Sequence, residues 1–588
     1  MMENTNKIII FGASLYGKVA FNILKDKYEI VAFSDNDEKK WSNSFCGIKV
    51  IPPDEIKEFE NVKIIIASQY SRSIGIQLRE LGFSDIGIFI YKDKLVNQEE
   101  YHGEYEIIYS KFGNIFGNVK LDKDSIDKVI NNYSNNYSQR KTRKKVLFIA
   151  YLFPPIGGSG VQRSVKFVKY LRDEGYEPVV LTVGKNVHNQ DIDKEMLNDI
   201  PEDIQIVRIN DELKNIMELS DVEQQEIINL YYGVVQSEEW IDKYITIINN
   251  DTSNVRSELI PDSHIYWVNN VLKSIDYKVN MQEIDLVFTT GYPYSAYFLG
   301  YYIKKKYDIP WVMDDRDAWI ANDYLSEIMW FKGKHATYDL EYELNGKMLN
   351  EVDCLITMAE QVSRDYISKF NINKEHVKQI TNGYDEEDIQ DISSTEKNEK
   401  FTLCYNGWVY LDRNPVVLLK IINSMIEDKE IDKDKIQWVF NGVIQVDIQE
   451  RLISEDKFNI LKFNGYLEHL DSLNIASKSD ALVLWGGIGE GAKVMYTGKI
   501  FEYLRLKRPI IGFSTSGGVF DEVFNATKCG QNFEYDDIDK IKQYLGYLYG
   551  KWKNNEIVCV GNNKEIEKYE RRNLTKKLAD IFNDLLKN

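Results

Sequence analysis

The chain has 588 residues, which is too long for one hydrophobic core, so it must divide into several domains. Apolar residues make up 43% and charged residues 28% of it, as in a folded protein without a membrane-spanning run. Lys and Arg number 73 against 92 Asp and Glu, and this net charge of −19 disfavours nucleic acid as a partner. The five cysteines are scattered without a CxxC pair, so neither a disulfide framework nor a zinc site is expected. The first residues lack a signal-peptide pattern, so we expect a cytoplasmic protein.

Residues 1–92 read as a small Rossmann-like accessory domain, with a strand KIIIF, the turn GASLYG, a helical stretch and a strand EIVAF. Gly12, Gly17 and Asp35 match part of a dinucleotide fingerprint, but Ser14 replaces the glycine that lets a pyrophosphate approach. Three interpretations stay open for this domain: a nucleotide or nucleotide-sugar site, a substrate-docking module, or an association domain through which the chain forms oligomers.

Residues 93–143 are rich in Asn, Ser and Lys without a sustained apolar period, which predicts a linker. Five of the six residues from Arg140 to Lys145 are cations. Such a run is either a solvated linker or a weak peripheral contact with the inner face of a membrane.

Residues 144–395 open with the strand KVLFIA, the loop YLFPPIGGSG and an amphipathic helix, and further strands follow at regular intervals. Within them, residues 185–260 read as an acidic, less regular insertion. Residues 396–564 start at FTLCYNG and repeat the alternation of strands and helices. Residues 565–588 predict a last helix that packs back toward the 144–395 domain. The expected fold class is therefore α/β, with two adjacent Rossmann-like domains preceded by a smaller one.

The segment YTGKIFEYL predicts a helix start that binds an anion. Thr497 can cap the helix, and the amides of Gly498 and Lys499 then point outward. Glu502, one turn further, can accept two hydrogen bonds from the vicinal hydroxyls of a ribose. The sequence thus indicates recognition of a nucleoside diphosphate.

Two further motifs favour a polar ligand site in the 144–395 domain. In PPIGGSG, Gly157 and Gly158 allow the backbone to approach a ligand closely. The segment DDRDAW, which includes Asp315, Arg316 and Asp317, directly follows a predicted strand, and open α/β sheets bind ligands at that edge.

In this order along the chain, the motifs resemble those of bacterial glycosyltransferases of family four, which have the GT-B fold of two facing Rossmann-like domains. The resemblance covers residues 144–588. It is carried by KVLFIAYLFPPIGGSGVQRSVKFVKYL, PDSHIYW, DDRDAW, NGYD, YNGWVY, FNGYLEHL and TGKIFEYL. It implies transfer of a sugar from a UDP- or GDP-linked donor, with retention of configuration and with no cofactor or metal required.

The resemblance also implies roles for individual residues. Arg413 and Lys499 would stabilise the charge of the leaving diphosphate. His264, the histidine of PDSHIYW, could accept a hydroxyl proton, and Asp317 is the fourth candidate catalytic residue. Asp315 and Arg316 would lie on the acceptor side. The candidate donor-binding residues are Gly157, Gly158, Gly407, Glu490, Thr497, Gly498 and Glu502.

The sequence departs from the family at one position. The family has two glutamates eight residues apart, yet Val494 stands eight residues before Glu502. Glu490, in the same loop, is our candidate replacement. The acceptor would be a glycan, lipid-linked or protein molecule in the synthesis of surface polysaccharide or glycoconjugate. Two alternatives stay open: a nicotinamide-dependent sugar oxidoreductase acting through residues 1–92, and a non-catalytic nucleotide-sugar-binding scaffold.

Overall fold

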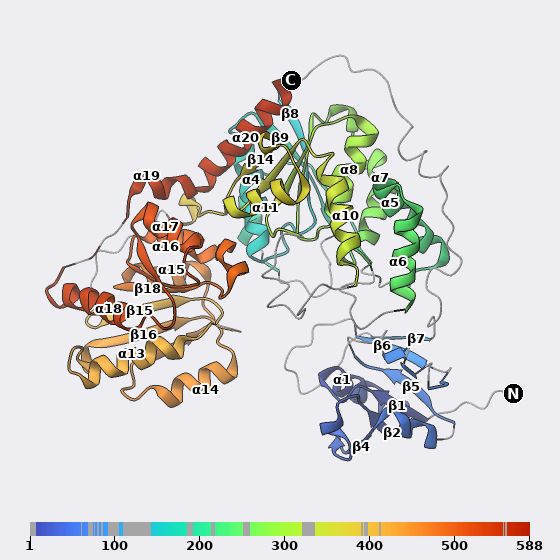
Figure 1. The fold of residues 1–588 in the computed structure, drawn as a ribbon, viewed down its shortest axis with the longest axis horizontal. Coiled ribbons are helices and arrows are strands. Elements are labelled where there is room, and N and C mark those ends of the chain that lie inside the picture. The colour runs from blue at the N-terminus through green and yellow to red at the C-terminus, as the bar shows by residue number, and fades with distance from the viewer. Residues whose placement is uncertain are drawn as a thin grey trace.

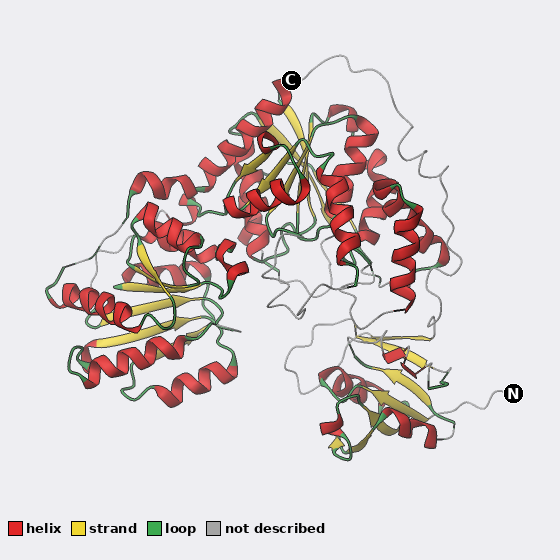
Figure 2. Ribbon diagram, in the orientation of Figure 1, coloured by secondary structure: helices red, strands yellow, loops and turns green. Residues whose placement is uncertain are grey.

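The computed structural model contains three α/β units joined in series (Figure 1). It describes residues 7–91, 105–109, 143–184, 192–250, 259–319, 336–392, 398–410 and 413–587, apart from short gaps at 60, 69–73, 76, 79–80, 84–85, 194, 213, 215–217, 390–391, 557 and 559–560. Helices cover the strands of the second and third units on both faces, as parallel sheets require (Figure 2).

The first unit is built on a seven-stranded sheet. Its order is β3 (Ser44–Phe45), β4 (Ile48–Ile51), β2 (Glu29–Ser34), β1 (Lys7–Phe11), β5 (Lys63–Ile66), β6 (Ile86–Tyr91) and β7 (Tyr105–Tyr109). The β3–β4 and β6–β7 pairs are antiparallel and the others parallel. Helix α1 (Leu15–Leu24) follows β1. β7 lies within the predicted linker, most of which falls outside the described residues.

The second unit has a wholly parallel sheet. Its order is β10 (Ile206–Ile209), β9 (Tyr176–Val183), β8 (Lys144–Ala150), β11 (Leu286–Thr290), β12 (Trp311–Asp315), β13 (Cys354–Thr357) and β14 (Val377–Gln379). Its helices are α4 (Ser159–Leu171), α5 (Asp221–Val235), α6 (Glu238–Asn250), α7 (Ile265–Lys278), α8 (Ala296–Tyr307), α10 (Tyr338–Leu349) and α11 (Glu360–Phe370). The strand order reverses between β8 and β11, which makes that point the switch where such sheets bind ligands.

The third unit has a parallel six-stranded sheet, whose strand order also reverses at one point. Its order is β17 (Leu461–Gly465), β16 (Ile436–Asn441), β15 (Phe401–Asn406), β18 (Ala481–Trp485), β19 (Ile510–Phe513) and β20 (Gly530–Phe533). Its helices are α13 (Pro415–Glu427), α14 (Val446–Glu455), α15 (His469–Lys478), α16 (Gly498–Leu506), α17 (Val519–Thr527) and α18 (Ile538–Lys553), with the 3-10 turn η8 (Glu490–Val494) before α16. Here the switch lies between β15 and β18.

The last helices run from the third unit to the second (Figure 1). The short α12 (Glu386–Ile389) lies at the end of the second unit, before β15. After the third unit, α19 (Asn563–Ile566) and the turn η9 (Glu567–Tyr569) lead into α20 (Arg571–Lys587). Leu574, Leu578 and Phe582 of α20 share a buried cluster with Phe148 of β8 and Phe288 of β11. The two doubly wound units and the small unit before them confirm the predicted fold class, which is GT-B with an added N-terminal α/β domain.

The prediction of an irregular insertion at residues 185–260 is wrong where the structure describes it, because α5 and α6 are regular helices. A capping box starts α5, in which the Ser220 hydroxyl accepts from the amide of Glu223 and the Glu223 carboxylate accepts from the amide of Ser220. Tyr231 of α5 and Trp240 and Tyr244 of α6 are buried together. Burial of α5 on several faces weakened its helical period in the sequence.

Candidate functional site

The predicted donor residues gather at the switch point of the third sheet. Gly407 directly follows β15, and η8 and α16 follow β18, its neighbour. Gly407 has φ +115°, and a Cβ there would lie 2.0 Å from Cε of Lys499. The glycine therefore lets the first turn of α16 approach the end of β15, which brings together two residues 92 positions apart.

The start of α16 is open. Gly498 is exposed, and a Cβ added to it would meet no atom within 4 Å. Thr497 occupies the N-cap position, but its side chain makes no capping hydrogen bond, so the predicted hydroxyl cap is wrong. Its Oγ1 atom is instead buried without a hydrogen-bond partner among the described residues. The helix thus keeps its first amides and an adjacent hydroxyl free of intramolecular capping.

Lys499, in the first turn of α16, has a lowered side-chain pKa. In the described part of the chain no hydrogen bond or ion pair engages its Nζ atom, which lies 6.0 Å from the ring centroid of Tyr405. Burial lowers the pKa of Lys499 to about 8, helped by repulsion from Arg413 and opposed by Glu502. An anion would supply the partner that the side chain lacks.

Arg413 lies beside Lys499 and is held by aromatic groups. Its guanidinium stacks on the ring of Tyr410, with Cζ 4.2 Å from the centroid. It donates to the carbonyl of Trp408 and, at 3.5 Å, to the hydroxyl of Tyr405. No carboxylate pairs with Arg413 in the described residues. Two cations therefore share one small region without a neutralising ion pair.

Glu502 is already engaged within the chain. Its Oε1 lies 2.9 Å from Nε2 of His469, the first residue of α15. The hydrogen bond to Glu502 is the main cause that raises the pKa of His469 above its ordinary value. A ribose diol would therefore share this carboxylate with His469. The sequence analysis missed His469, although it stands in FNGYLEHL, because nothing local links it to a residue 33 positions away.

Replacing Glu502 with glutamine is expected to lower the pKa of His469. Because the folded-state pKa is raised, the stabilisation from this pair is complete below 6.5, the ordinary value, and is lost as pH rises through the raised pKa. Glutamine keeps the size of the side chain and removes its charge. An NMR titration of the His469 ring protons measures the shift. An unchanged midpoint would show that the carboxylate does not hold the imidazolium.

The side chain of Glu490 lies largely in solvent. Its side chain is 83% exposed and pairs with Lys493, one turn on, at 2.8 Å. Val494 is half-buried and packs against the main core. As the replacement for the missing glutamate, Glu490 stays a prediction.

Three Asn-Gly pairs form a ladder that the sequence analysis missed. Asn406, Asn441 and Asn464 stand at the ends of β15, β16 and β17, each followed by a glycine. Asn464 Nδ2 donates to Asn441 Oδ1 at 2.7 Å, and Asn441 Nδ2 donates to Asn406 Oδ1 at 2.8 Å. Asn406 donates on to the carbonyl of Ser472 in α15. The ladder fixes the carboxyl edge of the sheet beneath Gly407.

In the second unit, Arg316 makes hydrogen bonds within the chain, whereas Gly158 and Asp317 are exposed. Arg316 donates to the carbonyls of Gly160, in the first turn of α4, and of Tyr292. It therefore ties the glycine loop to the loop after β11. Gly157 is buried, whereas Gly158 is exposed with φ +111° and open space around its Cβ position. Asp317 is half-exposed and lies 3.4 Å from Arg316.

Asp315 lies in the core, not on an acceptor-facing surface. It is fully buried and accepts from the hydroxyls of Tyr297 and Tyr366 and from the amide of Trp319. Burial raises its pKa to about 6 despite these hydrogen bonds. The neighbouring Asp314 forms a buried ion pair with Arg163 of α4. Both carboxylates thus hold the unit together.

His264 forms a buried contact with Asp211, which the sequence analysis did not single out. The Nδ1 atom of His264 lies 2.9 Å from Oδ2 of Asp211, and the Tyr151 hydroxyl donates to the same oxygen at 2.8 Å. The ring of Tyr151 packs against the imidazole with centroids 4.3 Å apart.

One group of described residues has the spacing of a metal site: Asp199, Asp385 and Asp388. Lys166 Nζ lies 2.7 Å from an oxygen of each, and Lys169 pairs with two of them. The lysine ammonium groups therefore occupy the place that a cation would take, and this cluster joins α4 to α12.

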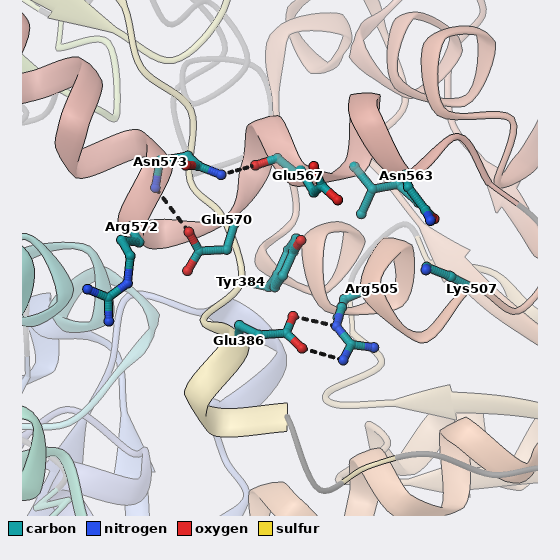
Figure 3. Close-up of a pocket in the computed structure, with 10 residues that line it drawn as sticks. Tyr384, Glu386, Arg505, Lys507, Asn563, Glu567, Glu570, Arg572 and Asn573 are labelled. Atoms are coloured by element: carbon teal, nitrogen blue, oxygen red, sulfur yellow. Dashed lines mark hydrogen bonds and ion pairs between the residues drawn. The ribbon is translucent and has the colours of Figure 1, made fainter.

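A pocket of about 560 Å³ lies where the second and third units meet, between α12, the end of α16 and the start of α20. Figure 3 shows Arg505 reaching Glu386 across it, while Asn573 contacts Glu567 and Glu570. The Arg505–Glu386 pair connects α16 to α12, so it links the candidate anion site to the junction between the units.

In the first unit, Asp35 is occupied by the chain itself. It accepts from the amides of Ala13 and Asp37, at 2.8 and 2.9 Å, and from Lys40 at 3.0 Å. A dinucleotide site needs this carboxylate for ribose hydroxyls and the amide of Ala13 for phosphate. The observed contacts therefore disfavour the dinucleotide interpretation. No described helix is both long and apolar enough to cross a membrane.

Comparison with known protein families yields a match in the first unit. The profile of the family described as C2185-like, N-terminal, matches residues 4–89. A search among curated proteins found no match.

Solved structures align with about three quarters of the chain. A glycosyltransferase from Rickettsia africae ESF-5 is 13% identical, with a TM-score of 0.46, and the alignment covers 76% of this chain and 100% of that one. HepE from Anabaena, in complex with UDP and glucose, is 11% identical, with a TM-score of 0.44 and coverage of 75% and 100%. Sucrose-phosphate synthase from Thermosynechococcus elongatus is 10% identical, with a TM-score of 0.48 and coverage of 76% and 100%. Likenesses this distant assign no activity to the chain.

Proposed function

We propose that residues 144–588 form a glycosyltransferase that takes a sugar from a nucleoside diphosphate donor, with the diphosphate bound at the start of α16. One observation carries this proposal. Four features gather at the switch point of the third sheet: the open helix start at Gly498, the Oγ1 of Thr497, which has no hydrogen-bond partner in the described part of the chain, Lys499 and Arg413. All of them offer hydrogen-bond donors or positive charge, which is what a diphosphate requires.

The same groups can stabilise the charge that develops on the leaving diphosphate. Transfer therefore needs no metal in this proposal, and retention of configuration is what the motif resemblance implies. Glu502 takes the ribose hydroxyls beside His469. The donor carries UDP or GDP, since contacts to ribose and diphosphate do not distinguish the base.

The acceptor side lies on the second unit, where Gly158 follows β8, Asp317 follows β12 and His264 packs against Tyr151 at the end of β8. We propose a glycan, lipid-linked or protein acceptor in surface polysaccharide or glycoconjugate synthesis. The transfer takes place in the cytoplasm, and the cations of residues 140–145 make a weak contact with the inner face of the membrane. The first unit serves docking or association, because Asp35 already holds the loop that a dinucleotide would need.

A thermal-shift screen of UDP- and GDP-sugars tests the function. A ligand at 100 times its dissociation constant adds about 2.7 kcal/mol to the stability of the folded state. The proposal predicts a shift with one donor class, slow release of nucleoside diphosphate from that donor, and no shift with NAD(H). Binding without turnover would favour the scaffold alternative, and a shift with NAD(H) alone would contradict the proposal.

A further inference from the structure

Asp211 and His264 form a pair at the carboxyl edge of the second sheet. Asp211 follows β10, and its side chain is completely buried. His264 stands at the start of α7 with 12% of its side chain exposed. Their contact joins Oδ2 of Asp211 to Nδ1 of His264 at 2.9 Å, across 53 residues of sequence.

The surroundings of this pair fix both partners. The Tyr151 hydroxyl donates to the same Oδ2, so the carboxylate cannot turn away without losing two hydrogen bonds. The Tyr151 ring lies against the imidazole, and the exposed ring of Tyr292 stands edge-on to it at 6.1 Å. Tyr151 follows β8 and Tyr292 follows β11, the two strands that form the switch point. The pair therefore lies where a doubly wound sheet binds its ligand.

The hydrogen bond decides which nitrogen of His264 can act. A carboxylate only accepts, so Nδ1 must carry the proton that it shares with Asp211. Nε2 then keeps its lone pair. No hydrogen bond or ion pair reaches Nε2 in the described parts of the chain. The imidazole is thus prepared to accept a proton at one atom.

We infer that Asp211 is a positioning residue that holds His264 as the base for the acceptor hydroxyl, an inference that rests on the proposed transfer function. Nε2 of His264 takes the proton of the hydroxyl, whose oxygen forms the new bond to C1 of the donor sugar on the same face from which the diphosphate leaves. The bond from C1 to the diphosphate oxygen breaks, and the nucleoside diphosphate leaves with that electron pair. Asp211 stabilises the imidazolium until its proton passes to solvent with product release.

The test replaces Asp211 with asparagine and measures hydrolysis of the donor found by the screen, with water as the acceptor. General base catalysis contributes about 10²- to 10⁴-fold, so kcat is expected to fall by at least about 100-fold. KM for the donor and the affinity for UDP or GDP are expected to stay unchanged. Tyr151→Phe is the matched control, because it removes a hydrogen bond to the same Oδ2 and keeps the Asp211–His264 contact. This variant is expected to lose only a few-fold in kcat.

Two further measurements separate a positioning role from a structural one. In ¹⁵N NMR at neutral pH, with His264 assigned through His264→Gln, the parent is expected to show the Nδ1–H tautomer and Asp211→Asn a mixture. His264→Gln leaves Asp211 in place, so it provides a second test should Asp211→Asn fold poorly. Its kcat is expected to fall as much as that of Asp211→Asn. Unchanged kcat in His264→Gln, or an Nε2–H tautomer in the parent, would overturn the inference. Failure of the parent to bind any donor would instead refute the proposed function. The NMR measurement would still report whether Asp211 fixes the tautomer of His264.

Discussion

Lys499→Met is expected to weaken the binding of nucleoside diphosphate by about 10- to 100-fold, because one charge-assisted hydrogen bond contributes about 1.5–3 kcal/mol. The side chain lies against Gly407 and has no ion pair within the described residues. Methionine fills much the same volume and relieves the repulsion with Arg413, so the fold should keep its stability. Isothermal titration with UDP and GDP gives the affinities. Lys493→Met is the matched control, since Lys493 lies in the preceding turn but pairs with the exposed Glu490.

The same lysine predicts how binding depends on pH. Its pKa in the free protein is about 8, and a bound anion favours the protonated form. Raising the pH from 7 to 9 should therefore weaken binding about tenfold, since roughly a tenth of the lysine stays protonated one unit above its pKa. Lys499→Met should abolish this dependence. An equal loss in the parent and the variant would assign the effect to another group.

Arg163→Met is expected to lower the free energy of unfolding by about 3–5 kcal/mol, because it leaves a buried carboxylate without its cation. Arg163 and Asp314 are each 1% exposed and joined by two hydrogen bonds of 2.9 and 2.7 Å. The guanidinium also donates to the carbonyls of Ile380 and Thr381, at the end of the second unit. One side chain thus fastens α4 to β12 and to the segment that leads into α12.

Denaturant unfolding measures this loss, and Arg172→Met, directly after the last residue of α4, provides the control. Arg172 pairs with Glu177 and with the largely exposed Asp203, and such surface pairs contribute about 0–1 kcal/mol. Similar losses in the two variants would show that the buried pair is no stronger than a surface one.

The sequence predicted the framework because parallel strands carry a local signal. Short apolar runs followed by glycine turns identified β1, β8 and β15, and alternation with helices predicted three doubly wound sheets. The fold class was confirmed for that reason. By contrast, α5 is buried on several faces, so it lacked the two-sided period by which a surface helix is recognised.

Long-range contacts explain what the sequence did not reveal about the site. The sequence predicts that Asp315 faces a ligand, but in the fold Tyr297 of α8 and Tyr366 of α11 enclose it. His469 and Asp211 matter only through Glu502 and His264, which lie 33 and 53 residues away. The start of α16 was predictable, since Thr497, Gly498 and Lys499 are adjacent. The missing cap at Thr497 was not, because capping depends on a rotamer.

The most direct test of the diphosphate site is the affinity of UDP and GDP for Gly498→Glu. A carboxylate at the first position of α16 suits the helix dipole and meets open space, so the fold should be unharmed. The same carboxylate would repel a diphosphate. Gly550→Glu, at another open position in α18, adds the same charge away from the site. The account predicts that the parent and Gly550→Glu bind one of the two nucleotides and that Gly498→Glu binds neither; equal binding by both variants, or no binding by the parent, would contradict it.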